Sequence, residues 1–163
     1  MGNRRRSREL AMQALFQIEM IQDDSLETIE LFSRHFGVSK SVRPFFLRLV
    51  QGVREFQDEI DALIERFSQN WKIGRMPRVD RNILRVAVYE LLHCHDIPPK
   101  VSINEAIDIA KRFGTGDSGA FVNGILDSVR IALEKEGRLH PDKNPDQTAN
   151  PSGLMIDDCS LKQ

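Results

Sequence analysis

The chain has 163 residues, 40% of them hydrophobic and 29% charged, so it is long enough to bury a core as one domain and has the composition of a soluble globular protein. No apolar run reaches the roughly 20 residues of a membrane span, and no apolar segment of a secretory signal follows the basic start of the chain, so we expect a cytoplasmic protein. The formal net charge of −1 excludes a strongly basic protein, but it leaves room for one basic face.

Helical spacing of apolar residues runs through the first part of the chain, where we find no pattern typical of strands. An apolar stripe that includes Leu10 predicts a first helix over residues 3–21. Asp24 and Glu27 fit a D-x-x-E capping pattern, in which the first carboxylate caps free N–H groups and the second reaches back. These two residues therefore predict the start of a second helix, which we expect to end at Gly37.

The middle of the chain predicts three further helices. Pro44 suits the first turn of a helix, and the apolar period continues from there nearly to residue 70. Gly52 weakens the middle of this run, so we interpret it as two helices that meet at a bend. A loop over 69–76 follows. The helix expected over 77–93 is apolar on almost every face, and such a helix belongs at the centre of a bundle.

Local start and stop signals mark the last two helices. Ser102 and Glu105 fit the S-x-x-E capping box and predict a helix start there, and Gly114 predicts its end. Asp117 or Ser118 is suited to cap the final helix. The sequence thus predicts an all-α fold of six or seven helices around one central helix.

The composition changes at residue 137, where Pro, Asp and Asn replace the periodic apolar residues. We therefore expect one helical domain over 1–136 and a disordered polar tail over 137–163. The two cysteines, Cys94 and Cys159, form no pattern of a disulfide framework or a metal site, so we expect reduced thiols.

A cluster of arginines is the first candidate for function. It stands before the first acidic residue and comprises Arg4, Arg5, Arg6 and Arg8. The planar guanidinium binds phosphate through paired donors and keeps its charge, so such a cluster adds salt-dependent affinity for nucleic acid. The alternative is a solvated terminus that only aids solubility.

Two other constellations favour a structural interpretation. The loop over 114–119 precedes a helix N-terminus, which attracts anions, but it lacks the lysine of a nucleotide-binding loop, so a capping turn is the better interpretation. The potential ligands in residues 93–96 are adjacent in sequence and cannot easily surround one metal ion. We find no motif that pairs a nucleophile with a base, and we expect no enzymatic activity, no metal and no cofactor.

Three segments together resemble the NusB family: residues 4–16, 79–91 and 96–127. The stretches IPPKVSINEA and FVNGIL within the third segment are specific in combination. The resemblance covers about residues 4–133 and implies an all-α bundle of about seven helices in two subdomains. It also implies a transcription antitermination factor that binds boxA-type single-stranded RNA of nascent ribosomal transcripts with the ribosomal protein NusE, within the RNA polymerase antitermination complex. A homodimer stays open.

The resemblance also assigns residues by position. The set expected to face RNA comprises Arg4, Arg5, Arg6, Arg8, Asp117 and Phe121. The set expected to face NusE comprises Phe16, Asp80 and Arg85, of which the two charged residues are expected to be exposed on the first turns of the central helix. Phe121 also begins an apolar stripe, so packing in the core is an equal alternative for it.

Two other functions remain as alternatives. RNA cytosine methyltransferases can carry a NusB-like domain at their N-terminus, but such enzymes need a following Rossmann-like domain with a Gly-rich cofactor loop and a Cys nucleophile. We expect no room for that domain in this chain. A helical protein-interaction module without RNA affinity is also compatible with the near-neutral total charge.

Overall fold

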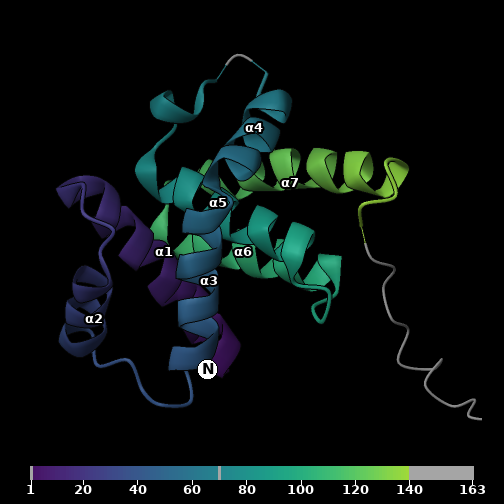
Figure 1. The fold of residues 1–163 in the computed structure, drawn as a ribbon. Helices are drawn as coiled ribbons and strands as arrows, with labels where there is room; N and C mark the ends of the chain where they lie inside the picture. Colours follow the sequence, from purple (N-terminus) through teal and green to yellow (C-terminus); the bar gives the residue numbers. More distant parts are fainter. Residues whose placement is uncertain (1, 70, 140–163) are drawn as a thin grey trace, which may run out of the picture.

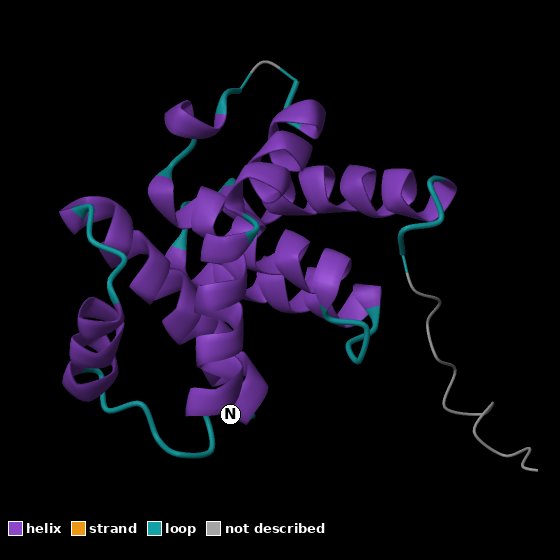
Figure 2. Ribbon diagram, viewed as in Figure 1, coloured by secondary structure: helices purple, strands orange, loops and turns teal. Residues whose placement is uncertain are grey.

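The computed structural model describes residues 2–69 and 71–139, and in this part of the chain all regular structure is helical (Figures 1 and 2). The elements are α1 (Asn3–Ile21), α2 (Leu26–His35), α3 (Arg43–Glu55), α4 (Gln57–Phe67), the 3-10 turn η1 (Ile73–Arg75), α5 (Arg78–His93), α6 (Pro99–Phe113) and α7 (Ser118–Lys135). None of these helices combines the length and the hydrophobicity needed to cross a bilayer. The predicted all-α fold is confirmed.

Helix α5 is the centre of the bundle. Residues 82–92 of this helix are all buried, and α5 packs against α1, α3, α4, α6 and α7. Helices α6 and α7 pack side by side as one pair, α1 and α3 pack as another, and both pairs rest on α5 (Figure 1). The buried side chains form one continuous hydrophobic core, and the predicted central position of this helix is confirmed.

The bend predicted in the middle of the chain lies at Phe56, which ends α3 and precedes α4. Gly52 lies one turn earlier, against the ring of Tyr89 on α5. A Cβ atom at Gly52 would overlap that ring, so the glycine permits the close approach of α3 to the central helix. The glycine that weakens the helical pattern therefore has a packing role.

The predicted cap of α2 is displaced by one residue. The N-cap is Ser25, whose hydroxyl accepts a hydrogen bond from the backbone N–H of Thr28 at 3.3 Å. Asp24 instead forms an ion pair with Arg54 on α3. The D-x-x-E interpretation was wrong because the neighbouring serine is an equally good cap and the aspartate has a partner far away in sequence.

The predicted capping box of α6 is also wrong. Helix α6 begins at Pro99, so Ser102 already lies within it. The Ser102 hydroxyl donates to Glu90 on α5 at 3.1 Å, and Glu105 binds Arg5 on α1 at 2.8 Å. Both side chains therefore join α6 to other helices, and proline starts the helix because it needs no N–H partner in the first turn.

The last helix ends in a local hydrogen-bonded turn. Gly137 adopts a φ of +67°, and the N–H of Arg138 donates to the carbonyl of Leu133 at 2.9 Å. Leu139 packs against the core. The first residues of the predicted tail thus belong to the C-terminal cap of α7, and residues 140–163 lie outside the described part of the chain.

Candidate nucleic-acid interface

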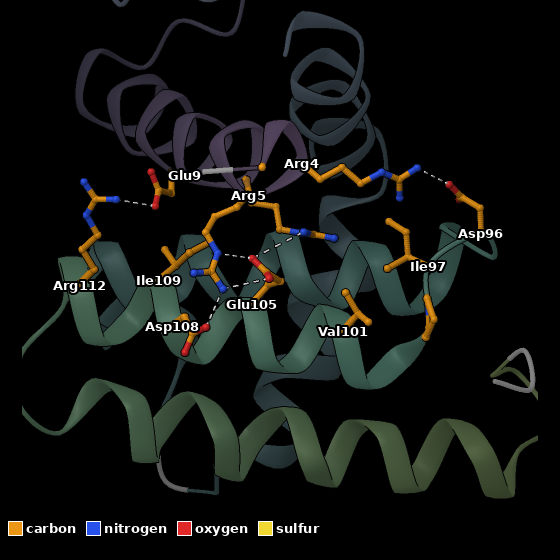
Figure 3. A pocket seen from close by; sticks show the side chains of 13 residues that line it. Arg4, Arg5, Glu9, Asp96, Ile97, Val101, Glu105, Asp108, Ile109 and Arg112 are labelled. Atoms are coloured by element: carbon orange, nitrogen blue, oxygen red, sulfur yellow. Dashed lines mark hydrogen bonds and ion pairs between the residues drawn. The ribbon is translucent and has the colours of Figure 1, made fainter. Parts of the chain in front are cut away.

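A groove of about 760 Å³ lies between the N-terminal half of α1 and helix α6 (Figure 3). Arginines from both helices line it, and so do carboxylates. The charged residues at the groove are Arg4, Arg5, Arg8 and Arg112 with Glu9, Asp96, Glu105 and Asp108. The four positive and four negative charges balance, so the predicted arginine cluster does not form an unpaired basic surface.

Arg5 lies in the middle of the groove and forms ion pairs with two carboxylates of α6. Its Nε donates to Glu105 at 2.8 Å, and its Nη2 donates to Asp108 at 2.7 Å (Figure 3). These contacts, and those to Glu105 above all, raise the pKa of Arg5 above its ordinary value. The guanidinium is nevertheless half-exposed, so it faces both α6 and the space in the groove.

Arg4 lies at one end of the groove, where Nη2 donates to Asp96 at 3.1 Å. Arg48 on α3 binds the same carboxylate at 2.9 Å, and its hydrogen bonds are the main reason that the pKa of Asp96 lies well below its usual range. The Arg4 guanidinium also lies over the ring of Phe45. The Arg4 side chain nevertheless remains 54% exposed.

Glu9 lies at the other end of the groove, and its side chain is only 2% exposed. It accepts a hydrogen bond from Arg112 at 2.8 Å and one from Arg6 at 3.5 Å. The Arg112 guanidinium lies over the ring of Phe113, and the Arg112 side chain is 54% exposed. A buried carboxylate therefore fixes two arginines whose guanidinium groups remain accessible.

Arg112 and the two carboxylates of α6 were not predicted as parts of a site. A signal for them was present, because Glu105, Asp108 and Arg112 have the spacing i, i+3 and i+7 that places side chains on one helix face. The interpretation of Glu105 as a cap concealed this pattern.

Arg8 differs from the other arginines of the cluster because it is buried. Its side chain is 4% exposed, and Nη2 and Nε bind the carboxylate of Glu90, itself 1% exposed, at 2.8 to 3.1 Å. Burial raises the pKa of Glu90, and the hydrogen bonds from Arg8 oppose that rise. The expected RNA-facing position of Arg8 is therefore not found. Arg8 lies on the apolar stripe of α1, three residues before Ala11 and seven before Leu15.

The other two residues of the expected RNA-facing set lie at the start of α7. Asp117 is exposed at the N-cap position, and its side chain forms no cap hydrogen bond. The hydroxyl of Ser118 accepts a hydrogen bond from the N–H of Thr115 in the preceding loop. Phe121 is half-buried, so packing and exposure are combined in one side chain. Neither residue lines the groove, but the loop before α7 follows directly on the end of α6 that carries Arg112.

The set expected to face NusE lies mostly inside the protein. Asp80 is 5% exposed and Arg85 is 6% exposed, so the expectation that both are exposed charges was wrong. Arg85 donates to Asp61 on α4 at 2.8 Å and also binds Glu19 on α1. Arg85 is thus buried together with carboxylates from two of the helices that cover α5. The Oδ1 atom of Asp80 accepts no hydrogen bond from any described residue.

Glu19 connects this cluster to α1, where Phe16 is half-buried one turn earlier. Its carboxylate binds Arg81 at 2.6 Å as well as Arg85. Burial raises the pKa of Glu19, but the hydrogen bond from Arg81 and the charges of both arginines outweigh that effect and leave the pKa below its ordinary value. The seam between α1 and α5 is therefore an ion-pair cluster.

The described residues contain no group of three or more His, Cys, Asp or Glu side chains that could hold a metal ion. Cys94 follows α5 and is buried, which raises the pKa of its thiol to about 12.

Comparisons with known proteins show which proteins this chain is similar to. The family model described as the NusB family matches residues 5–130. The transcription antitermination protein NusB of Desulfatibacillum aliphaticivorans is 55% identical over 136 residues, which cover 83% of this chain and 95% of that protein. The protein of the same name from Desulforapulum autotrophicum is 53% identical over 133 residues, which cover 80% and 93%.

Solved structures give the same result. The structure of T. maritima NusB has 42% sequence identity and a TM-score of 0.71, and the match covers 83% of this chain and 97% of that chain. A structure of the antitermination factors NusB and NusE in complex with dsRNA has 26% identity and a TM-score of 0.74, and the match covers 81% and 98%. The chain belongs to the NusB family of non-enzymatic transcription antitermination proteins.

Proposed function

We propose that this protein binds boxA-type RNA of nascent transcripts jointly with the ribosomal protein NusE, as part of an RNA polymerase antitermination complex in the cytoplasm. The observation that carries the proposal is the row of accessible guanidinium groups of Arg4, Arg5 and Arg112 along one groove. The accessible guanidinium group of Arg6 binds Glu9, which lines the same groove. The solved complex of NusB, NusE and dsRNA supports the choice of both partners.

Phosphate binding in the groove requires an exchange of partners. Exposed ion pairs such as Arg4–Asp96 and Arg5–Asp108 contribute only about 0–1 kcal/mol each, so a phosphate can replace the carboxylate at small cost. Arg8 has a different part, since its pairing with Glu90 fixes α1 against α5 and α6 beneath the groove. We therefore include Arg112 in the RNA-binding set and assign Arg8 to the support of that set.

Asp117 and Phe121 extend the proposed RNA surface to the start of α7. The stem of Lys111 runs past Gly119, where a Cβ atom would lie 3.2 Å from its Cγ, so a further cation stands beside this turn. For NusE we propose the seam between α1 and α5, with Phe16 at its surface. Arg85 holds the seam together from below.

The proposal is tested by filter binding of boxA RNA and of a scrambled RNA, each with and without NusE. We expect boxA RNA to bind more tightly than the scrambled RNA, and NusE to increase the difference. Because the RNA in the solved complex is double-stranded, the same sequence is also measured as a duplex. Binding of NusE without any preference for boxA RNA would instead indicate a protein-interaction module.

A double variant connects this affinity to the groove. Arg4→Gln with Arg5→Gln removes two exposed cations, and each phosphate contact contributes about 0.7 to the slope of log affinity against log salt for single strands. We expect the slope to fall by roughly 1.4 in magnitude. Arg66→Gln is the control, because Arg66 is an equally exposed arginine that pairs with Glu136 away from the groove. An unchanged slope in the double variant would contradict the placement of RNA in this groove.

A further inference from the structure

Trp71 is the only tryptophan of the chain, and it lies on the surface between α4 and η1. The residue is 49% exposed. Its ring lies against that of Phe121 on α7, with 6.1 Å between the centroids and an angle of 55° between the planes. The backbone beside the ring is fixed, since the N–H of Trp71 donates to the carbonyl of Ser68 and the Ser68 hydroxyl donates to the carbonyl of Trp71.

Two cations follow Trp71 closely in the chain: Lys72 is the next residue, and Arg75 is the last residue of η1. Lys72 and Arg75 are both exposed, and neither forms an ion pair with an acidic residue in the described part of the chain. The arginines of the groove, in contrast, are all paired with carboxylates. We call Trp71, Phe121, Lys72 and Arg75 the Trp71 platform.

We propose that the Trp71 platform binds the unpaired bases of single-stranded RNA, with a base stacked on Trp71 and the adjacent phosphates held by Lys72 and Arg75. Proteins bind single strands by this combination of exposed aromatic rings and cations, because every base offers a flat face. In a duplex both faces of each base are covered by its neighbours, so the platform selects the single strand.

This inference rests on the proposed function and extends it. Phe121 already belongs to the proposed RNA surface at the start of α7, and Trp71 is its direct neighbour. The platform therefore continues that surface from the end of α6 across α7 to η1. An RNA strand on this surface would meet the arginines of the groove, which are paired with carboxylates, at one end and the unpaired cations Lys72 and Arg75 at the other.

The fluorescence of Trp71 reports on stacking directly, because a base stacked on an indole ring quenches the fluorescence of the indole. The full chain with NusE is titrated with a single-stranded RNA dodecamer of boxA sequence, and the Trp71→Phe variant serves as the blank for emission from NusE. We expect quenching that saturates at the RNA concentration at which filter binding saturates. The duplex of the same sequence should leave the emission of Trp71 unchanged.

Substitutions separate stacking from charge. Loss of one stacked base weakens binding about ten-fold, so we expect this loss for Trp71→Leu and nearly normal affinity for Trp71→Phe, which keeps a ring. Lys72→Ala and Arg75→Ala should each lower the magnitude of the salt slope by roughly 0.7. Both side chains are exposed, so these two variants should fold and test the platform even if Trp71→Leu does not fold. Lys135→Ala, at the far end of α7, is the control and should change nothing.

The outcomes distinguish this proposal from the function on which it rests. The Trp71 platform would be overturned if boxA RNA bound specifically but did not quench Trp71, and if Trp71→Leu, Lys72→Ala and Arg75→Ala all kept normal affinity and salt slope. The proposed function would then remain in place. Absence of specific RNA binding by the wild-type chain with NusE would overturn both.

Discussion

Replacement of Arg8 by methionine removes the guanidinium that binds Glu90 and keeps a side chain that fills part of the same space. Glu90 would then keep the Ser102 hydroxyl as its donor, although its carboxylate is buried. Loss of one member of a buried ion pair costs about 3–5 kcal/mol, because the other charge remains without compensation. In a domain of this size 1 kcal/mol shifts the melting temperature by roughly 3 °C, so we expect Arg8→Met to melt about 10–15 °C below the wild type at pH 7.

The deficit of Arg8→Met should depend on pH with a defined sign. Burial already raises the pKa of Glu90, and the variant loses the hydrogen bonds and the charge of Arg8 that oppose this rise. A carboxyl group whose pKa is higher in the folded state favours folding below its unfolded pKa, and this contribution is lost as the pH rises through the folded pKa. The deficit should therefore be largest at neutral pH and should shrink as the pH falls toward about 4.3.

Circular dichroism melts from pH 5 to 7.5 measure this difference directly. Arg6→Met is the matched control, since Arg6 is an exposed member of the same cluster and its removal should change stability by about 0.5 kcal/mol or less. Arg8→Met combined with Glu90→Gln should recover part of the loss, because no buried charge remains. If Arg8→Met had the melting temperature of the wild type and its affinity for RNA depended less on salt, Arg8 would face RNA and the assignment to the core would be wrong.

Two further predictions concern other parts of the core. Burial raises the pKa of the Cys94 thiol to about 12, so at pH 8 iodoacetamide should modify Cys94 only after the protein is unfolded in urea. Peptide mass spectrometry detects the modification, and modification of Cys94 in the folded protein would contradict this prediction. Gly52→Ala should cost about 1–3 kcal/mol because its Cβ overlaps Tyr89, whereas Gly124→Ala in open space should be neutral or stabilising; equal melting temperatures would refute the packing role of Gly52.

Helix positions could be predicted well where the apolar period is the dominant signal. The predicted first helix over 3–21 matches α1 at both ends, and the central helix was recognised because it is apolar on almost every face. Helix starts were less reliable. Ser102 and Glu105 have the spacing of a capping box, but their partners are Glu90 and Arg5 on other helices, and no local pattern contains that information.

The site was predictable as a cluster of cations but not as a set of pairs. The sequence shows Arg4, Arg5 and Arg6 near one another, whereas the carboxylates that neutralise them come from the same helix and from the segment around α6. The burial of Arg85 and Arg8 also depends on partners far away in the chain. Arg8 nevertheless carried a signal, since its spacing to Ala11 and Leu15 places it on the buried face of α1.

The ion pair between Arg8 and Glu90 has a consequence for the order in which the molecule is made. The two residues are 82 positions apart. At a synthesis rate of about 5–20 residues per second, Glu90 is added roughly 4–16 s after Arg8. During this interval the ribosome completes α3, which packs against α1, but it has not completed α5 or made α6. The face of α1 that packs on α5 therefore lacks its carboxylate and part of its apolar cover. The helix that is synthesised first is thus fully enclosed only late in synthesis, and until then part of its apolar stripe is open to contacts with other chains.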